Sequence, residues 1–119
     1  MSRDPAVLLR HILLCLDRIA DFTVDGKNAF LADARTQDAV IRNLEVIGQA
    51  VKDIGAEDLA ARHATIPWRQ VAGFRNVLAH QYLGVDLILV WNVVTMHLPS
   101  LRFAIESELS RHSESGSNA

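Results

Sequence analysis

The chain has 119 residues, of which 50% are hydrophobic and 22% charged, and its formal net charge is −2. A chain of this length forms one domain, and its composition excludes an intrinsically disordered polypeptide. No stretch approaches about 18 uncharged apolar residues, so we expect no membrane span. The N-terminal segment lacks the cleavage site of a signal peptide, and the single cysteine, Cys15, has no partner for a disulfide. These features predict a soluble cytoplasmic protein.

The first half of the chain has the period of amphipathic helices. Asp4 is placed to cap a helix over residues 5–22, whose apolar residues recur every three or four positions. A short turn over 27–31 precedes a second long helix over 33–54. Gly48 lies in the middle of that helix, where a glycine costs about 1 kcal/mol relative to alanine. We therefore expect another helix to approach closely at Gly48.

The second half continues the helical pattern without any strand alternation. A short helical piece over 57–63 is followed by a helix over 67–81, which a proline opens. The last helical segment ends near residue 109, and the polar residues 110–119 are predicted to be a disordered tail. The fold class is therefore all-α, an antiparallel bundle of four or five helices forming a single domain over 1–109.

The helix that Asp86 caps is apolar on almost every side, up to Pro99, which is expected to kink or restart it. Such a helix is typical of burial against both its own bundle and a second subunit. Together with the dense apolar face of the first helix, it predicts at least a homodimer, because a monomer would expose Trp91 and its neighbours.

Charge is distributed unevenly along the chain. Residues 59–85 contain no Asp or Glu but include Arg62, Arg69 and Arg75. This clustering is either chance or a surface that attracts phosphate, and the second interpretation requires other features in the same place.

The segment that begins at Arg75 holds the residues best suited to chemistry: Arg75, Asn76, His80 and Tyr82. On an ideal helix Asn76 and His80 lie roughly opposite the core-facing stripe, so His80 is expected to face solvent or a partner subunit. Arg75 and His80 are about 140° apart on that helix, so spacing alone does not bring them together. They could meet across a two-fold axis, or they could be ordinary surface residues.

The sequence contains no motif for nucleotide binding by a phosphate loop or for metal binding. There is no glycine-rich phosphate loop, and no His, Cys or Asp cluster has the spacing of a metal site. Asp17 and Asp21 are interpreted as part of a solvated helix face, and Cys15 as a buried core thiol. The sequence therefore predicts neither a metal nor a cofactor.

The string RNVLAHQY resembles the R-x4-H-x-Y signature of the HEPN superfamily, in particular the HepT-like (DUF86) toxins. The resemblance extends over residues 5–109. RTQDAVIRNLEVIGQAVKDI is similar to the second helix of this family, IPWRQVAGFRNVLAHQYLGVD to its catalytic segment, and VWNVVTMHLPSLR to its last helices.

The resemblance implies a helical bundle that dimerises, with Arg and His residues of both subunits in a cleft at the interface. It also implies a metal-independent endoribonuclease that serves as the toxin of a toxin–antitoxin pair. The partner is a minimal nucleotidyltransferase (MNT) antitoxin, which adds AMP to the tyrosine of the motif. On this chain Arg75 and His80 become the catalytic pair, Asn76 and Arg69 supporting or RNA-binding groups, and Tyr82 the modification target.

The residue types suit that role. Histidine exchanges protons near neutrality, and arginine offers phosphate a fixed fork of donors. RNA cleavage by attack of the 2′-OH would leave a 2′,3′-cyclic phosphate and a 5′-OH. The alternative is a helical subunit that binds a nucleotide or a nucleotidyltransferase and cleaves nothing.

Overall fold

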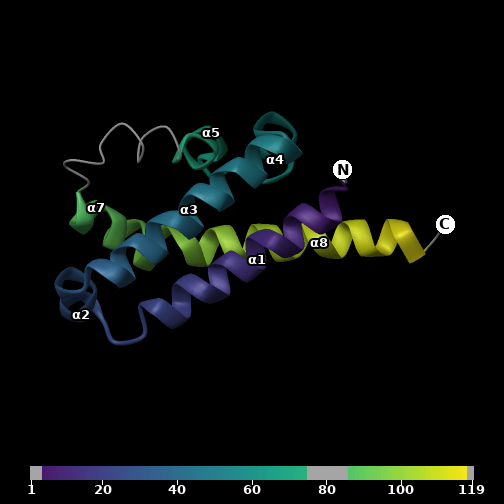
Figure 1. Ribbon diagram of the computed structural model, residues 1–119. Helices are drawn as coiled ribbons and strands as arrows, with labels where there is room; N and C mark the ends of the chain where they lie inside the picture. Colours follow the sequence, from purple (N-terminus) through teal and green to yellow (C-terminus); the bar gives the residue numbers. More distant parts are fainter. Residues whose placement is uncertain (1–3, 75–85, 118–119) are drawn as a thin grey trace.

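The computed structural model describes residues 4–74 and 86–117, and within these ranges it contains helices and short connections but no strand (Figure 1). The all-α prediction is confirmed. The helices form an elongated bundle built on three long segments, α1, α3 and α8, with the short α2, α4, α5 and α7 at its ends and edge.

Helices α1 (Pro5–Phe22) and α3 (Ala34–Ile54) run in opposite directions and pack along their length. Helix α1 begins as the sequence predicted, and α3 begins one residue after its predicted start at residue 33; an aspartate side chain caps the first turn of each. Asp4 accepts a hydrogen bond from the Ala6 amide at 2.9 Å, and Asp33 from the Arg35 amide at 3.0 Å. The connection between them, predicted as a turn, is a short helix, α2 (Lys27–Ala32).

Helix α3 ends at Gly55, whose φ of 116° is accessible mainly to glycine. Two short helices follow, α4 (Ala56–Arg62) and α5 (Trp68–Ala72). The predicted helix over 67–81 is interrupted within its first half, since α5 ends at Ala72 and Gly73 forms a turn. Glycine is a weak helix former, which accounts for the interruption at that position.

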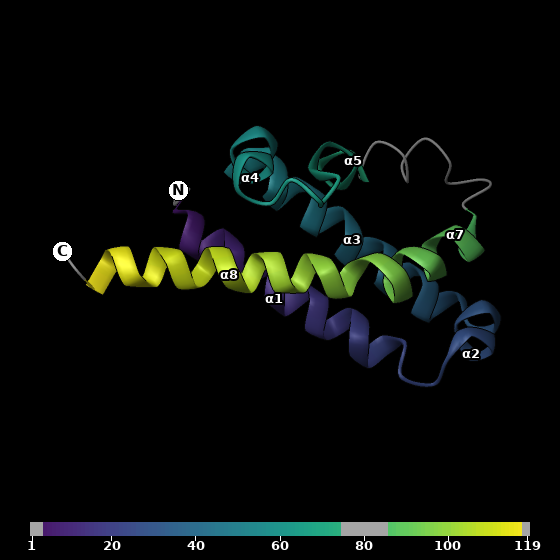
Figure 2. The ribbon, with the colours of Figure 1, turned by 180° about the vertical axis from the view of Figure 1, so that it is seen from behind.

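The chain from Leu87 onward forms one long run of helix, which Figure 2 shows extending along the whole molecule. It consists of α7 (Leu87–Asn92), a π-helical turn η1 (Val93–His97) and α8 (Leu98–Ser117). Asp86 caps α7 as predicted, accepting from the Ile88 and Leu89 amides at 3.1 Å. The predicted disturbance at Pro99 takes the form of η1, because a proline cannot donate to the carbonyl four residues earlier.

Helix α8 also extends further than the sequence predicted. Its end was expected near residue 109 with a disordered tail after it, yet the backbone is helical to Ser117. No proline interrupts this stretch, and Arg111 pairs with Glu108 one turn earlier at 3.3 Å, a spacing that supports a helix.

The core lies between α1, α3 and α8 and is closed by single side chains of the short helices. Trp91, whose helix was expected to be buried against both the bundle and a second subunit, packs against Phe30 of the bundle with ring centroids 5.5 Å apart. Cys15 is buried as predicted, and burial raises the pKa of its thiol despite nearby Arg18. The largest fully buried side chains include Trp68, Phe30, Leu9, Ile12, Ile19, Ile47, Leu59 and Ile105.

One helix in the described part of the chain, Leu87–His112, has the length and composition to cross a membrane, which the sequence analysis did not expect. This is weak evidence for a span, because the core helix of a soluble protein meets the same criterion. Leu98, Leu101 and Ile105 of this helix belong to the core between the long helices.

Candidate functional site

The predicted site residues fall into two groups. Arg69 is on α5 and is described. Arg75, Asn76, His80 and Tyr82 lie outside the described residues, so the structure places none of them. The structure does describe the residues that directly precede this segment, namely α5, Gly73 and Phe74.

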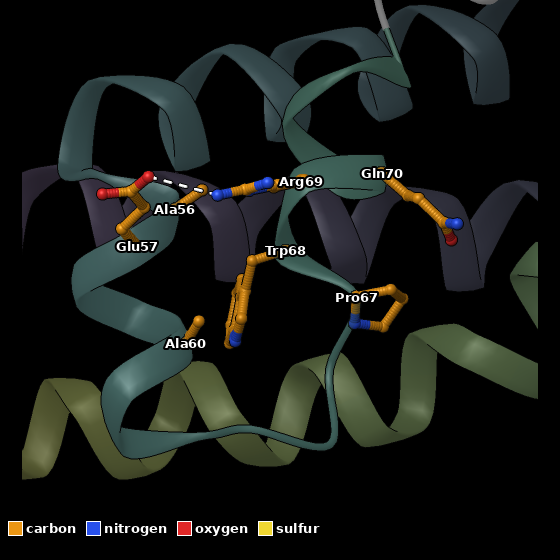
Figure 3. Close-up of a pocket in the computed structure, with 7 residues that line it drawn as sticks. All are labelled: Ala56, Glu57, Ala60, Pro67, Trp68, Arg69 and Gln70. Carbon is orange, nitrogen blue, oxygen red and sulfur yellow. Dashed lines mark hydrogen bonds and ion pairs between the residues drawn. The ribbon is translucent and has the colours of Figure 1, made fainter.

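Helix α5 is held to the bundle by its first residue. The Trp68 side chain is 2% exposed and points down between α4 and the connection that precedes α5 (Figure 3). Its indole Nε1 donates a hydrogen bond to the His63 carbonyl at 2.8 Å. A buried tryptophan with its N–H satisfied fixes both the position and the rotation of a helix only five residues long.

Gly48 gives α5 its second attachment, on α3. A Cβ atom at Gly48 would lie 2.7 Å from the Val71 carbonyl oxygen and 3.3 Å from the Phe74 Cβ. The close helix approach predicted at this glycine is therefore confirmed, and the approaching helix is the one that leads to Arg75.

Arg69 lies at the surface beside a pocket of about 470 Å³ between α4 and α5. Its guanidinium reaches toward Glu57 of α4, and the two pair at 3.3 Å (Figure 3). Both side chains are more than four-fifths exposed, and ion pairs of this kind contribute only about 0–1 kcal/mol. A phosphate could therefore displace Glu57 at little cost.

A second charged cluster surrounds Glu108 of α8, a carboxylate that is only 1% exposed. Arg62 donates to it through Nε at 2.6 Å, and His63 Nε2 lies 2.8 Å from it. Arg62 also pairs with Asp58 at 3.0 Å. The C-terminal end of α4 is thereby fixed to α8 by charge-assisted hydrogen bonds.

Burial raises the pKa of Glu108, but the hydrogen bonds from Arg62 and His63, with the positive charge of Arg62, outweigh it and lower that pKa to about 2. Glu108 is therefore ionised at neutral pH. Its partner Arg62 belongs to the acid-free stretch 59–85, as does Arg69. Both are paired with carboxylates from outside that stretch, so the positive surface predicted from the sequence is compensated at the two arginines that the structure describes.

Within residues 4–74 and 86–117, no group of three or more His, Cys, Asp or Glu side chains could hold a metal ion.

The fold and the sequence define a class of protein, a helical bundle in which an Arg-x4-His segment follows a short anchored helix in the chain. A family model described as Ribonuclease HepT-like matches residues 12–108. The chain belongs to this ribonuclease family, as the sequence analysis predicted.

The names of similar curated proteins describe the same kind of enzyme. "Probable ribonuclease HepT" of Thermococcus cleftensis is 40% identical over 107 residues, which are 89% of this chain and 96% of that protein. "Putative RNase MJ1380" of Methanocaldococcus jannaschii is 35% identical over 88% of this chain and 96% of its own length. A third, "Gamma-glutamylcyclotransferase and putative RNase MJ0434" of the same organism, is 38% identical over 86% of this chain. The match spans only 46% of that third protein. No solved structure matches the chain significantly.

Proposed function

We propose that the protein is a metal-independent endoribonuclease and the toxin of a type II- or VII-like toxin–antitoxin pair, acting in the cytoplasm. The observation that carries the proposal is membership of the HepT-like ribonuclease family over residues 12–108, a range that includes the whole Arg75–Tyr82 segment. The printed names of the relatives, which describe ribonucleases, support the same activity.

In this proposal the reaction is cleavage of RNA by its own 2′-OH. A base removes the 2′-OH proton, the 2′ oxygen bonds to the adjacent phosphorus, and the bond from phosphorus to the 5′ oxygen breaks. The 5′ oxygen takes up a proton, leaving a 2′,3′-cyclic phosphate and a 5′-OH. His80 exchanges one of these protons, and a second His80 from a partner subunit could exchange the other.

Arg75 stabilises the charge that develops on the phosphate oxygens, since its guanidinium stays protonated and presents several donors. Asn76 supplies a further polar contact. Arg69 binds the RNA backbone after leaving Glu57, an exchange that the weak, exposed Arg69–Glu57 pair permits.

Expression of the toxin without a partner tests the catalytic assignment. His80→Ala and Arg75→Ala should each lower RNA cleavage by roughly 10²–10³-fold or more and relieve growth inhibition, because each removes a group that acts in the transition state. Arg42→Ala, at an exposed arginine of α3, is the control and should remain toxic. A His80→Ala protein as toxic as wild type would remove the histidine from the mechanism.

The same purified protein tests whether a metal is required. Because His80 and Arg75 supply the proton transfer and the charge stabilisation, cleavage should continue in excess EDTA. Loss of cleavage on chelation, with recovery on adding magnesium or manganese, would contradict the metal-independent mechanism.

We further propose that an MNT-type nucleotidyltransferase neutralises the toxin by adding AMP to Tyr82. Tyr82 is two residues beyond His80, so an added AMP would bring a bulky anion close to where the RNA phosphate binds. Occupancy of the site and repulsion between like charges would then block cleavage.

Co-expression with a nucleotidyltransferase encoded by a neighbouring gene, followed by measurement of the intact mass of the toxin, tests this modification. Wild type should gain mass in AMP increments, whereas Tyr82→Phe should not and should stay toxic. Equal neutralisation of both proteins without any mass gain would mean that the antitoxin acts by binding alone.

A further inference from the structure

A cavity of about 600 Å³ separates α5 from the long helix formed by α7, η1 and α8. One wall is the stretch from Thr65 to Phe74, and the other is the face that carries Leu89, Val93 and Leu101. The volume is within the range of roughly 300–1,000 Å³ typical of small-molecule sites. The proposed proton transfer does not use this cavity, and of the proposed RNA-binding residues that the structure describes, Arg69 lines it.

The lining has the chemistry of a site for a flat, weakly polar ring joined to an anion. Most of the lining area is apolar, and Phe74 supplies an aromatic ring. Polar side chains come from both walls: Arg69 and Gln70 from α5, and His97 and Ser100 from the facing helix. None of the described residues that line the cavity is Asp or Glu, and Glu57, outside the lining, pairs with Arg69 at 3.3 Å.

The position of the cavity in the chain links it to the reaction. Its α5 wall ends at Phe74, and Arg75 is the next residue, so the two Cα atoms are about 3.8 Å apart. The proposed phosphate-binding residue therefore follows the cavity wall directly in the chain.

The facing wall carries a second indication. His97 is the last residue of the π-helical turn η1, and its side chain is exposed at the cavity. Single π-helical turns inside α-helices occur frequently at functional sites, because they change which side chains face a given direction. Here the turn lies between Leu89 and Ser100, both of which line the cavity.

We propose that this cavity is a base-binding subsite, which takes one unpaired nucleobase of the RNA beside the cleaved phosphate. Phe74 contacts the face of the base, and Gln70 and His97 form hydrogen bonds with its edge, so these two residues set the base preference. The assignment rests on the proposed function, since it is RNA that would deliver the base.

Binding of an RNA that cannot be cleaved tests the subsite independently of catalysis. The probe is a fluorescent single-stranded octanucleotide with 2′-O-methyl riboses, together with eight versions that each lack one base. For wild type, removing the base at one position should weaken binding by about tenfold, the scale of losing one stacked base. In the double variant Gln70→Ala/His97→Ala that penalty should fall to about threefold, because the hydrogen bonds to the edge of the base are lost while its contact with Phe74 remains. The matched control is His11→Ala/Asn28→Ala, at exposed positions of α1 and α2, and it should keep the full penalty.

Each outcome distinguishes the subsite from the proposed function. An equal penalty in wild type and in the double variant, or the absence of any octanucleotide binding, would overturn the subsite. Conversion of a dimeric wild type into a monomer by the double substitution would also overturn it, because the cavity wall would then be a contact between copies of the chain. A wild type that shows the base-dependent penalty but cleaves no RNA would support the subsite and overturn the endoribonuclease.

Discussion

Gly48 shows how a single residue on one helix can control a site on another. The Val71 carbonyl of α5 would be 2.7 Å from a Cβ at this position, closer than real Cβ atoms approach their neighbours. The obstacle is backbone, so a methyl group there requires α5 to move rather than a side chain to rotate. Since α5 leads directly to Arg75, that movement would be transmitted to the proposed catalytic segment.

We expect Gly48→Ala to lower the free energy of unfolding by about 1–2 kcal/mol, because overpacking outweighs the better helix propensity of alanine. RNA cleavage should fall by at least tenfold under conditions in which the variant is still folded, since small displacements of catalytic groups have large effects on rate. Urea unfolding and initial cleavage rates measure the two effects. Ser107→Ala, at an exposed helical position of α8, is the control and should change neither. Full activity of Gly48→Ala would show that the close approach is not required for positioning.

At the scale of elements, Glu108 connects α8 to α4 and to the start of the connection toward α5. Arg62 and His63 donate to it from one end of α4, and Arg111 approaches it from the next turn of α8. A buried carboxylate with several charge-assisted hydrogen bonds is stable only while the whole set is intact, because removing one member leaves the others without compensation. The cluster therefore acts as a clamp on the α4–α5 unit.

Glu108→Gln should lower the free energy of unfolding by about 2–3 kcal/mol, since its amide hydrogens would face the donors of Arg62 and His63. The control is Glu106→Gln on the same helix, where the carboxylate is exposed and 3.9 Å from Arg102; it should change the free energy of unfolding by less than about 0.5 kcal/mol. Chemical denaturation at neutral pH measures both values. Equal effects of the two substitutions would mean that the Glu108 cluster contributes no more to the free energy of unfolding than an exposed ion pair does.

The clamp also predicts a pH dependence with a definite sign. The pKa of Glu108 is about 2 in the folded protein against an ordinary value of 4.5, so its contribution is complete above pH 4.5 and is lost as the pH falls toward 2. The free energy of unfolding of wild type should therefore decrease over that interval more steeply than that of Glu108→Gln. Parallel pH profiles for the two proteins would contradict this assignment.

At the scale of the whole molecule, the features that sequence predicts are those encoded by neighbouring residues. The aspartate caps at Asp4 and Asp86 each lie within three residues of the amides that they cap, so these two helix starts were predicted from the sequence, and Asp33 caps α3 in the same local way. Glu108 appears in the sequence as an ordinary surface glutamate, because its partner Arg62 is 46 residues away.

The candidate site stays a prediction at Arg75, Asn76, His80 and Tyr82, because these residues lie outside the described ranges. The Arg-x4-His-x-Tyr spacing is local and was recognised, whereas the angles assigned to it assumed a helix that continues through Gly73, and α5 ends before that residue. The base cavity was not predicted, since its two walls come from stretches about 20 residues apart and its polar groups have no shared motif.

The exposed apolar side chains of the long helix indicate how the proposed homodimer forms. Met96 and Phe103 are seven residues apart, are 69% and 76% exposed, and do not line the base cavity. A seven-residue apolar repeat on a helix surface is the pattern through which two helices pack against each other. Exposed apolar residues arranged in this way mark an interaction surface, whereas isolated ones are ordinary. We therefore place the dimer contact along the stripe formed by Met96 and Phe103.

Substitution of one exposed residue on the stripe and one away from it tests this placement. Wild type should sediment as a dimer of about 26 kDa, twice the 13.2 kDa chain. Phe103→Lys should give the 13.2 kDa monomer at micromolar concentration, because dimerisation would bury the lysine charge in an apolar contact. The matched control is Val24→Lys, since Val24 is 78% exposed in the connection after α1, and it should leave the dimer intact. The monomer should also lose RNA cleavage if, as proposed, the two subunits share the reaction. A wild type that sediments as a folded monomer would contradict the dimer itself, whereas a dimeric Phe103→Lys would move the contact to another face.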